Sequence, residues 1–152
     1  MPVHTSIGGR ILDKRPTNLY SHAHSSFLGL ITMDRRIEII ISKMKKDTAA
    51  SWDTPTLAVL VNLSPSRFRH LFKQETDITP AQYLKDIRLT KAEKMLRTTF
   101  FSIKQILKQV GIASNAHFVR DFRRKYGATP TAYRRTLRRK QRQRRVATSD
   151  KK

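Results

Sequence analysis

The chain has 152 residues, and its 32 Lys and Arg against 11 Asp and Glu give a formal net charge of +21. Hydrophobic residues make up 38% of it, enough to bury a core, so we expect one folded domain or two very small ones rather than wholesale disorder. The absence of cysteine excludes disulfides, thiolate catalysis and Cys-ligated zinc. The excess of cations favours a polyanionic partner, most often nucleic acid and less often an anionic membrane surface.

Residues 1–34 predict a flexible leader, because they contain a Gly8-Gly9 pair and scattered prolines but no sustained helical or strand period. They are too few for an effector-binding domain, which needs about 100 residues. No apolar stretch reaches the roughly 18 residues that span a bilayer, so we expect a soluble protein with no membrane partner. A cysteine-free chain suits the reducing cytoplasm, which is the expected location.

The leader also holds a weak metal candidate. It consists of three histidines, His4, His22 and His24. No acidic or Cys residue stands at ligand spacing from them, so we predict neither a metal nor a cofactor.

The first predicted helix begins after Asp34, which can cap it. Its apolar side consists of Ile37, Ile40, Ile41 and Met44. Downstream, the sequence repeats itself at an offset of 50 residues. The aligned sets are Phe68, Phe72, Thr79, Pro80 and Tyr83 with Phe118, Phe122, Thr129, Pro130 and Tyr133. Chance matches rarely keep one register for so long, which indicates two copies of one supersecondary unit.

The first copy predicts a helix, a tight turn and a second helix. Thr54 can cap the first helix with Pro55 at its first position, and the helix should stop at Asn62. Its apolar stripe consists of Leu57, Leu60 and Val61. Ser64 and Pro65 then open the second helix.

The second copy follows the same plan. Ser102 and Gln105 have capping-box spacing before a helix that should stop at Gly111, and Ser114 opens the next helix. The stripe of the first of these helices consists of Ile103, Ile106, Leu107 and Val110. Upstream of the second helices the repeat offset becomes 49, which aligns Asn62 with Gly111. Asn and Gly adopt a left-handed backbone most readily, so these equivalent residues predict the same sharp turn.

Two short helices joined by a three-residue turn match the helix-turn-helix unit, whose second helix enters a DNA major groove. The phenylalanines of the second helices could instead stack on unpaired bases, as in single-strand binders. Their helical spacing beside apolar neighbours favours a role in the core. They are Phe68, Phe72, Phe118 and Phe122.

Between the copies, Thr79 and Gln82 have capping-box spacing before a predicted linker helix over about 80–97. At a rise of about 1.5 Å per residue this rod is about 26 Å long, comparable with the roughly 34 Å between successive major grooves on one DNA face. The predicted fold is all-α, with one subdomain over about 35–78 and another over about 102–135.

The chain ends in a strongly basic segment. Residues 134–152 hold ten Lys or Arg and one Asp, and we expect residues 136–152 to form a flexible tail. Residues 35–133 still carry a net charge of +11, so the predicted core is basic without the tail.

Residues 63–96, LSPSRFRHLFKQETDITPAQYLKDIRLTKAEKML, and 110–134, VGIASNAHFVRDFRRKYGATPTAYR, resemble the DNA-binding domain of the AraC/XylS family of bacterial transcription regulators. The closing stretch is the more specific, with Gly, Phe, Phe-basic-basic, Gly, Thr-Pro and Tyr-Arg in order. The resemblance covers about residues 35–135. Because the chain has no room for an effector-binding domain, it resembles the single-domain members of the family. It implies seven helices, two helix-turn-helix subdomains, and promoter binding in the nucleoid by an activator that contacts RNA polymerase.

On the first recognition helix, four polar residues lie at i, i+3, i+4 and i+7 opposite the apolar face: Ser66, Arg69, His70 and Lys73. The planar fork of Arg69 can bind guanine O6 and N7, which is worth about 1–3 kcal/mol of discrimination, while Ser66 and His70 can donate to several base acceptors. Lys73, one turn further on, is expected to meet phosphate. The alternative is a solvated charged face, which the repeat disfavours.

On the second recognition helix, Asn115 and Arg120 can read bases, whereas Ala116 and Val119 can only touch thymine methyls. Asn115 has a second interpretation, as a structural residue near the helix cap.

The remaining phosphate contacts are expected from cap hydroxyls and neighbouring basic groups, namely Ser64, Arg67, Ser114, His117 and Arg123. Asp121 and Lys125, at i and i+4, predict a surface ion pair of little consequence.

We therefore expect a sequence-specific regulator that binds an asymmetric duplex site as a monomer, with one helix in each of two successive major grooves. The alternative is a basic architectural or RNA-associated protein with little sequence preference. An enzyme is not expected, because the sequence lacks a Gly-rich phosphate loop, a Ser-His-Asp arrangement and a carboxylate pair at acid-base spacing.

Overall fold

The structure is a computed structural model that describes residues 33–149. Residues 1–32, with His4, His22 and His24, lie outside the described residues, as do residues 150–152. Over residues 33–149 the regular elements are seven helices and no strand, which confirms the all-α prediction. The helices are α1 (Arg35–Lys46), α2 (Thr54–Val59), α3 (Pro65–Thr76), α4 (Pro80–Thr98), α5 (Ile103–Val110), α6 (Asn115–Tyr126) and α7 (Pro130–Ser149).

Capping residues begin most of these helices where the sequence predicts. The carboxylate of Asp34 accepts a hydrogen bond from the first turn of α1. Thr79 and Gln82 form a capping box at the start of α4, and Ser102 and Gln105 form another at the start of α5. Each box satisfies two backbone N–H groups that the helix itself leaves unpaired.

The start of α2 differs from the prediction by one residue. Asp53, not Thr54, caps this helix, and its Oδ1 accepts a hydrogen bond from the Thr56 N–H at 2.7 Å. A carboxylate also carries the negative charge that a helix N-terminus favours. The buried residues of α2 and of the turn that follows it are Leu57, Ala58 and Val61. Leu60, predicted to be in the stripe, lies at the edge of that face and is 45% exposed.

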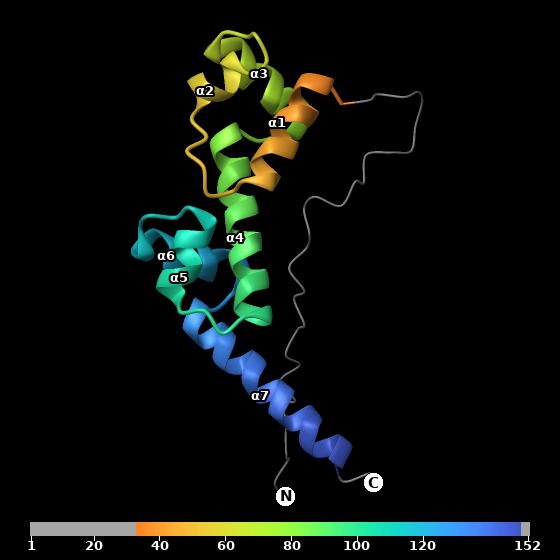
Figure 1. Cartoon of the computed structure of the whole chain (residues 1–152), viewed down its shortest axis with the longest axis vertical. Coiled ribbons are helices and arrows are strands. Elements are labelled where there is room, and N and C mark those ends of the chain that lie inside the picture. The colour runs from red at the N-terminus through yellow and green to blue at the C-terminus, as the bar shows by residue number, and fades with distance from the viewer. Residues whose placement is uncertain (1–32, 150–152) are drawn as a thin grey trace, which may run out of the picture.

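Each helix-turn-helix unit has its own core, and α4 contributes residues to both. Figure 1 shows α4 running from one unit to the other. The first core is made of Ile37, Ile40, Met44, Leu57, Ala58, Val61, Phe68, Leu71, Phe72, Tyr83 and Leu84. The second is made of Leu89, Ala92, Leu96, Ile106, Leu107, Val110, Phe118 and Phe122. All four phenylalanines of the recognition helices are at most 1% exposed, which confirms their role in the core.

The two predicted turns adopt the left-handed backbone, with φ of 54° at Asn62 and 74° at Gly111. Gly111 also touches the first subdomain, since a Cβ added there would lie 2.7 Å from both the Cα and the carbonyl oxygen of Ala49. Only glycine fits such a close approach at a positive φ.

The loop that contains Ala49 is hydrogen-bonded to two side chains of α4. The Nε of Arg88 donates to the carbonyl oxygen of Thr48 at 2.8 Å, and its Nη2 donates to that of Ala50 at 2.9 Å. The Nζ of Lys91 donates to the Thr48 hydroxyl at 2.9 Å. This loop therefore links α1, the middle of α4 and the second helix-turn-helix turn.

The basic C-terminal segment differs from the predicted flexible tail. α7 continues through residues 136–149 as a helix that runs on past the second core (Figure 1). The segment is rich in Arg, Lys and Gln, which favour helices, and it contains neither Gly nor Pro after Pro130. No helix within the described range is long and apolar enough to cross a membrane.

Candidate nucleic-acid interface

The first recognition helix, α3, presents its predicted polar stripe to solvent. The hydroxyl oxygen of Ser64 caps the helix by accepting from the Arg67 N–H at 3.3 Å. The face that carries Phe68, Leu71 and Phe72 is buried in the first core. The opposite face is exposed and carries Ser66, Arg69, His70 and Lys73.

The second recognition helix, α6, is arranged in the same way with one difference. Most of its candidate residues are exposed, namely Asn115, Ala116, His117, Arg120 and Arg123. Val119 is half-buried against the second core, so only part of it can reach a thymine methyl. Ala116, Val119, Arg120 and Arg123 also line one open hollow in the surface.

The cap of α6 is Ser114, which is half-buried and whose hydroxyl accepts from the His117 N–H at 3.3 Å. Asn115 is therefore the first residue of the helix and does not cap it. Its exposed side chain leaves base reading open to it.

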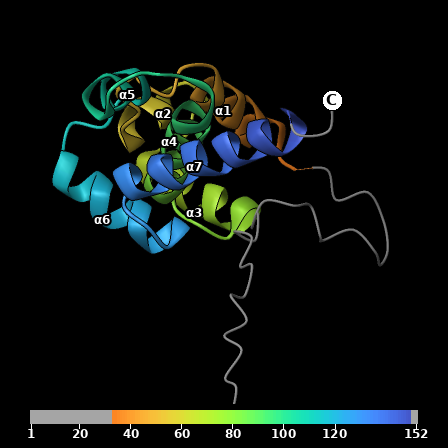
Figure 2. The same ribbon diagram turned by 90° about the horizontal axis from the view of Figure 1, so that it is seen from below.

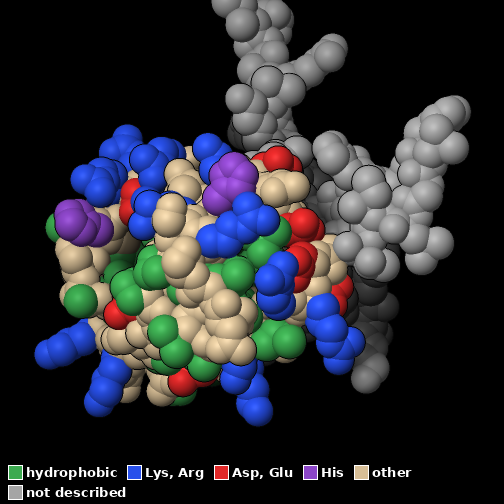
Figure 3. Space-filling view, turned by 90° about the horizontal axis from the view of Figure 1, so that it is seen from above, with side chains coloured by type: hydrophobic (Ala, Val, Ile, Leu, Met, Phe, Trp, Pro, Cys, Tyr) green, Lys and Arg blue, Asp and Glu red, His purple; other side chains and the backbone are tan. Residues whose placement is uncertain are grey.

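The two recognition helices lie on the same side of α4 (Figure 2) and are separated along the long axis of the molecule (Figure 1). α4 has 19 residues, which at about 1.5 Å per residue makes a rod of about 28 Å. Figure 3 looks from the opposite end, with the α3 side at the top, and Lys, Arg and His side chains gather along that edge. The exposed stripes thus share one basic side.

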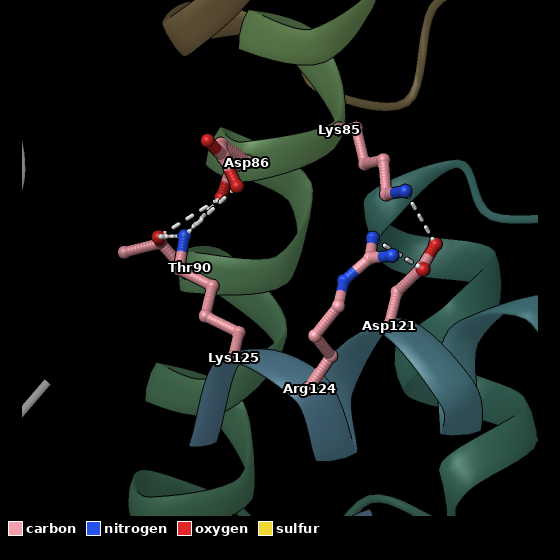
Figure 4. Close-up of polar contacts among 6 residues, drawn as sticks. All are labelled: Lys85, Asp86, Thr90, Asp121, Arg124 and Lys125. Carbon is pink, nitrogen blue, oxygen red and sulfur yellow. Dashed lines mark hydrogen bonds and ion pairs between the residues drawn. The ribbon is translucent and has the colours of Figure 1, made fainter. Parts of the chain in front are cut away.

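Asp121 is not in the predicted surface pair with Lys125. It is 7% exposed, and its Oδ2 lies 2.7 Å from the Nζ of Lys85 on α4, while its Oδ1 accepts from Arg124 at 2.9 Å (Figure 4). The hydrogen bond from Lys85 lowers the pKa of Asp121. Lys125 instead contacts Asp86, with 3.2 Å between its Nζ and the carboxylate Oδ1.

Sequence reasoning missed this cluster because Lys85 and Asp121 stand far apart in the chain. The one signal in the sequence was the repeat itself, which aligns Asp121 with the apolar Leu71. Among the described residues there is no group of three or more His, Asp or Glu side chains placed to hold a metal ion.

Residues 57–136 match a family model described as a helix-turn-helix domain. The chain belongs to the AraC/XylS family of transcription regulators. It is similar to the arabinose operon regulatory protein of Escherichia coli K12, with 33% identity over 103 residues that cover 67% of this chain and 35% of that protein. It is also similar to the HTH-type transcriptional activator RhaR of Mannheimia succiniciproducens, with 30% identity over 99 residues that cover 65% of this chain and 36% of that protein. The chain thus spans about a third of the length of these AraC/XylS relatives.

Among solved structures, the chain is similar to the DNA-binding domain of AdpA, described as a global transcriptional factor and crystallised with a target DNA. The TM-score is 0.68 at 25% identity, and the match covers 72% of this chain and 99% of that one. The described part of this AraC/XylS chain is therefore the family's DNA-binding domain with two helix-turn-helix units. The proteins named here are transcription regulators, and none is named as an enzyme.

Proposed function

We propose that this protein recognises a specific, asymmetric site in double-stranded promoter DNA as a monomer, with α3 and α6 in two successive major grooves. The observation that carries this proposal is the placement of two solvent-facing stripes, polar on α3 and mixed polar and apolar on α6, on one side of a rod of about 28 Å. That length is close enough to the roughly 34 Å repeat of a major groove for each helix to meet a groove of its own. Two reading helices in one chain make a dimer unnecessary.

Base reading is assigned to residues in the first half of each recognition helix. On α3, Arg69 binds guanine, and Ser66 and His70 donate to neighbouring base acceptors. On α6, Asn115 and Arg120 supply the hydrogen bonds. Ala116 and the exposed part of Val119 supply only methyl contacts, so the second half-element is expected to be the less sharply defined.

Phosphate contacts are assigned to the edges of the stripes and position the helices without reading sequence. The residues are Ser64, Arg67, Lys73, Ser114, His117 and Arg123. The two cap hydroxyls accept from backbone N–H groups, and each still has its own hydrogen to donate to a phosphate oxygen.

We further propose that the bound protein activates transcription from the nucleoid through contact with RNA polymerase. The relative named as a transcriptional activator supports this direction of regulation. A template that carries the selected site upstream of a promoter, transcribed by purified polymerase, should give more transcript when the protein is added. An unchanged or lower yield refutes activation.

Selection from random duplexes at about 150 mM salt, with excess competitor DNA, tests the binding proposal. We expect one recurrent motif with two different half-elements about one helical turn apart. A pool that shows no enrichment supports the architectural alternative, in which the basic surface binds any sequence. Sedimentation of the protein on the selected duplex should give one copy per site, and two copies would refute the monomer.

A further inference from the structure

The second recognition helix carries a carboxylate where the first carries a leucine. The repeat aligns Asp121 with Leu71, and the two residues are buried to a similar extent, at 7% and 8% exposure. Taking a carboxylate out of water is costly unless a cation and hydrogen bonds compensate for it. Asp121 has both, from Lys85 at 2.7 Å and from Arg124 at 2.9 Å.

Lys85 belongs to the first subdomain's part of α4. Tyr83 and Leu84, just before it, lie in the first core, whereas the second core takes its α4 residues from Leu89 onward. The Lys85–Asp121 pair therefore crosses the boundary between the subdomains and ties α6 to the helix section that is packed with α3 (Figure 4).

A second pair crosses the same boundary with the charges reversed. Lys125, one turn after Asp121 on α6, lies 3.2 Å from the carboxylate of Asp86 and 3.3 Å from the hydroxyl of Thr90. The cation of one pair and the anion of the other are thus on α4, next to each other. If α6 moved so that the partners were exchanged, Asp121 would face Asp86 and Lys125 would face Lys85. These like charges repel, so the two ion pairs together favour one orientation of α6.

We propose that Asp121 is a positioning residue for DNA recognition. Through Lys85, and with Asp86 and Lys125, it fixes the orientation of the second recognition helix relative to the first. It thereby sets the spacing between half-elements that the protein accepts, a consequence that rests on the proposed two-groove binding.

The substitution that tests this is Asp121→Leu, which copies Leu71 from the first unit. Removing one partner of an ion pair is costly when the other charge stays buried. The side chains of Lys85 and Arg124 are 43% and 69% exposed, so both cations keep contact with water and we expect this variant to fold. The chain has no cysteine, so Gln74→Cys on α3 and Lys104→Cys on α5 can carry a pair of spin labels at exposed sites. Pulsed electron paramagnetic resonance on the free protein then measures the distribution of distances between the subdomains.

We expect one narrow distribution for the labelled parent and a broader or shifted one for Asp121→Leu. Lys85→Met, which removes the partner on α4 instead, should change the distribution in the same way. Arg36→Gln is the matched control, because it removes an ion pair with Asp34 that lies within the first subdomain, and it should change nothing. A distribution that both boundary variants leave unaltered overturns the proposal.

The second readout uses duplexes in which the selected half-elements are moved one base pair closer or further apart. We expect the parent to bind its preferred spacing about tenfold or more tightly than the altered ones, and Asp121→Leu to lose most of that ratio. An unchanged ratio overturns the effect on spacing. If the parent selects no motif at all, the proposed function fails instead, and the label distances still decide whether Asp121 orients α6.

Discussion

Substitution of Gly111 by alanine is the sharpest test of how the two subdomains meet. The new Cβ would lie 2.7 Å from the Cα and from the carbonyl oxygen of Ala49, and 3.0 Å from its carbonyl carbon. These are backbone atoms of a loop held by Arg88, so no side-chain rotation can relieve the contact. The backbone of residue 111 is also left-handed, with φ of 74°.

Two costs therefore add in Gly111→Ala. An alanine in the left-handed region costs about 1–2 kcal/mol. Forcing a methyl group into a packed contact typically costs a further 1–3 kcal/mol or so. Gly127→Ala is the matched control, because its φ of 77° carries the same strain while nothing lies within 4 Å of its added Cβ. We expect about 2–5 kcal/mol for Gly111→Ala and about 1–2 kcal/mol for Gly127→Ala.

Urea denaturation followed by circular dichroism measures both free energies of unfolding, and the difference between the variants isolates the contact with Ala49. In thermal melts the Gly111 variant should lose several more degrees than the control, at about 4 °C per kcal/mol for a domain of this size. Ala49→Gly should not rescue it, since the atoms that clash are not in the side chain. Equal losses for the two glycine variants would refute the close approach.

Three further outcomes are expected. Arg69→Ala should relax preference at one or two base pairs of the selected site while Lys73→Ala weakens all duplexes alike, and equal losses on every sequence for both would contradict the assignment of their roles. Residues 138–152 carry eight basic side chains, and their removal should make DNA affinity fall less steeply with salt. The slope of log affinity against log salt concentration should decrease by about 0.9 for each phosphate that these side chains neutralise, while the selected motif stays the same. An unchanged salt slope would show that this segment does not touch DNA. Burial and a 2.6 Å hydrogen bond to Glu93 raise the pKa of Tyr133 to about 12, so its contribution to stability is complete below about pH 10 and is lost as the pH rises through 12. Burial also raises the pKa of Tyr83 and Tyr126, so the measurement is the difference between two proteins. Tyrosinate absorbance should rise at lower pH in Glu93→Gln than in the parent, and identical curves would contradict the role of this bond.

Local chemistry was enough to predict most of the helix plan. The capping boxes at Thr79 and Ser102 depend on residues three apart, and the left-handed turns at Asn62 and Gly111 depend on the preference of single residues. The repeat placed Phe68 and Phe118 in equivalent cores, and the helical period put Arg69 and Arg120 on exposed faces. Such features are readable because each involves neighbours within one or two helical turns.

Where local preferences compete, neighbouring residues alone do not decide the structure. Asp53 and Thr54 are adjacent and both can cap, and the carboxylate prevailed. The basic segment after residue 135 was expected to be flexible because of its charge, yet its residues favour helix and α7 continues through it. Charge alone does not decide between these states.

How the two subdomains pack against each other depends on contacts between residues that are far apart in the chain. The sequence predicted a surface pair for Asp121, but the structure buries it. Whether a carboxylate at this position meets a cation depends on how α6 lies across α4, and Lys85 reaches it from a distant part of the chain. The contact of Gly111 with Ala49 likewise requires both units to be packed on the same rod. Sequence alone therefore determined two helix-turn-helix units and most of the side chains that their second helices expose. Packing between elements remote in the chain determined how α6 is held relative to α3.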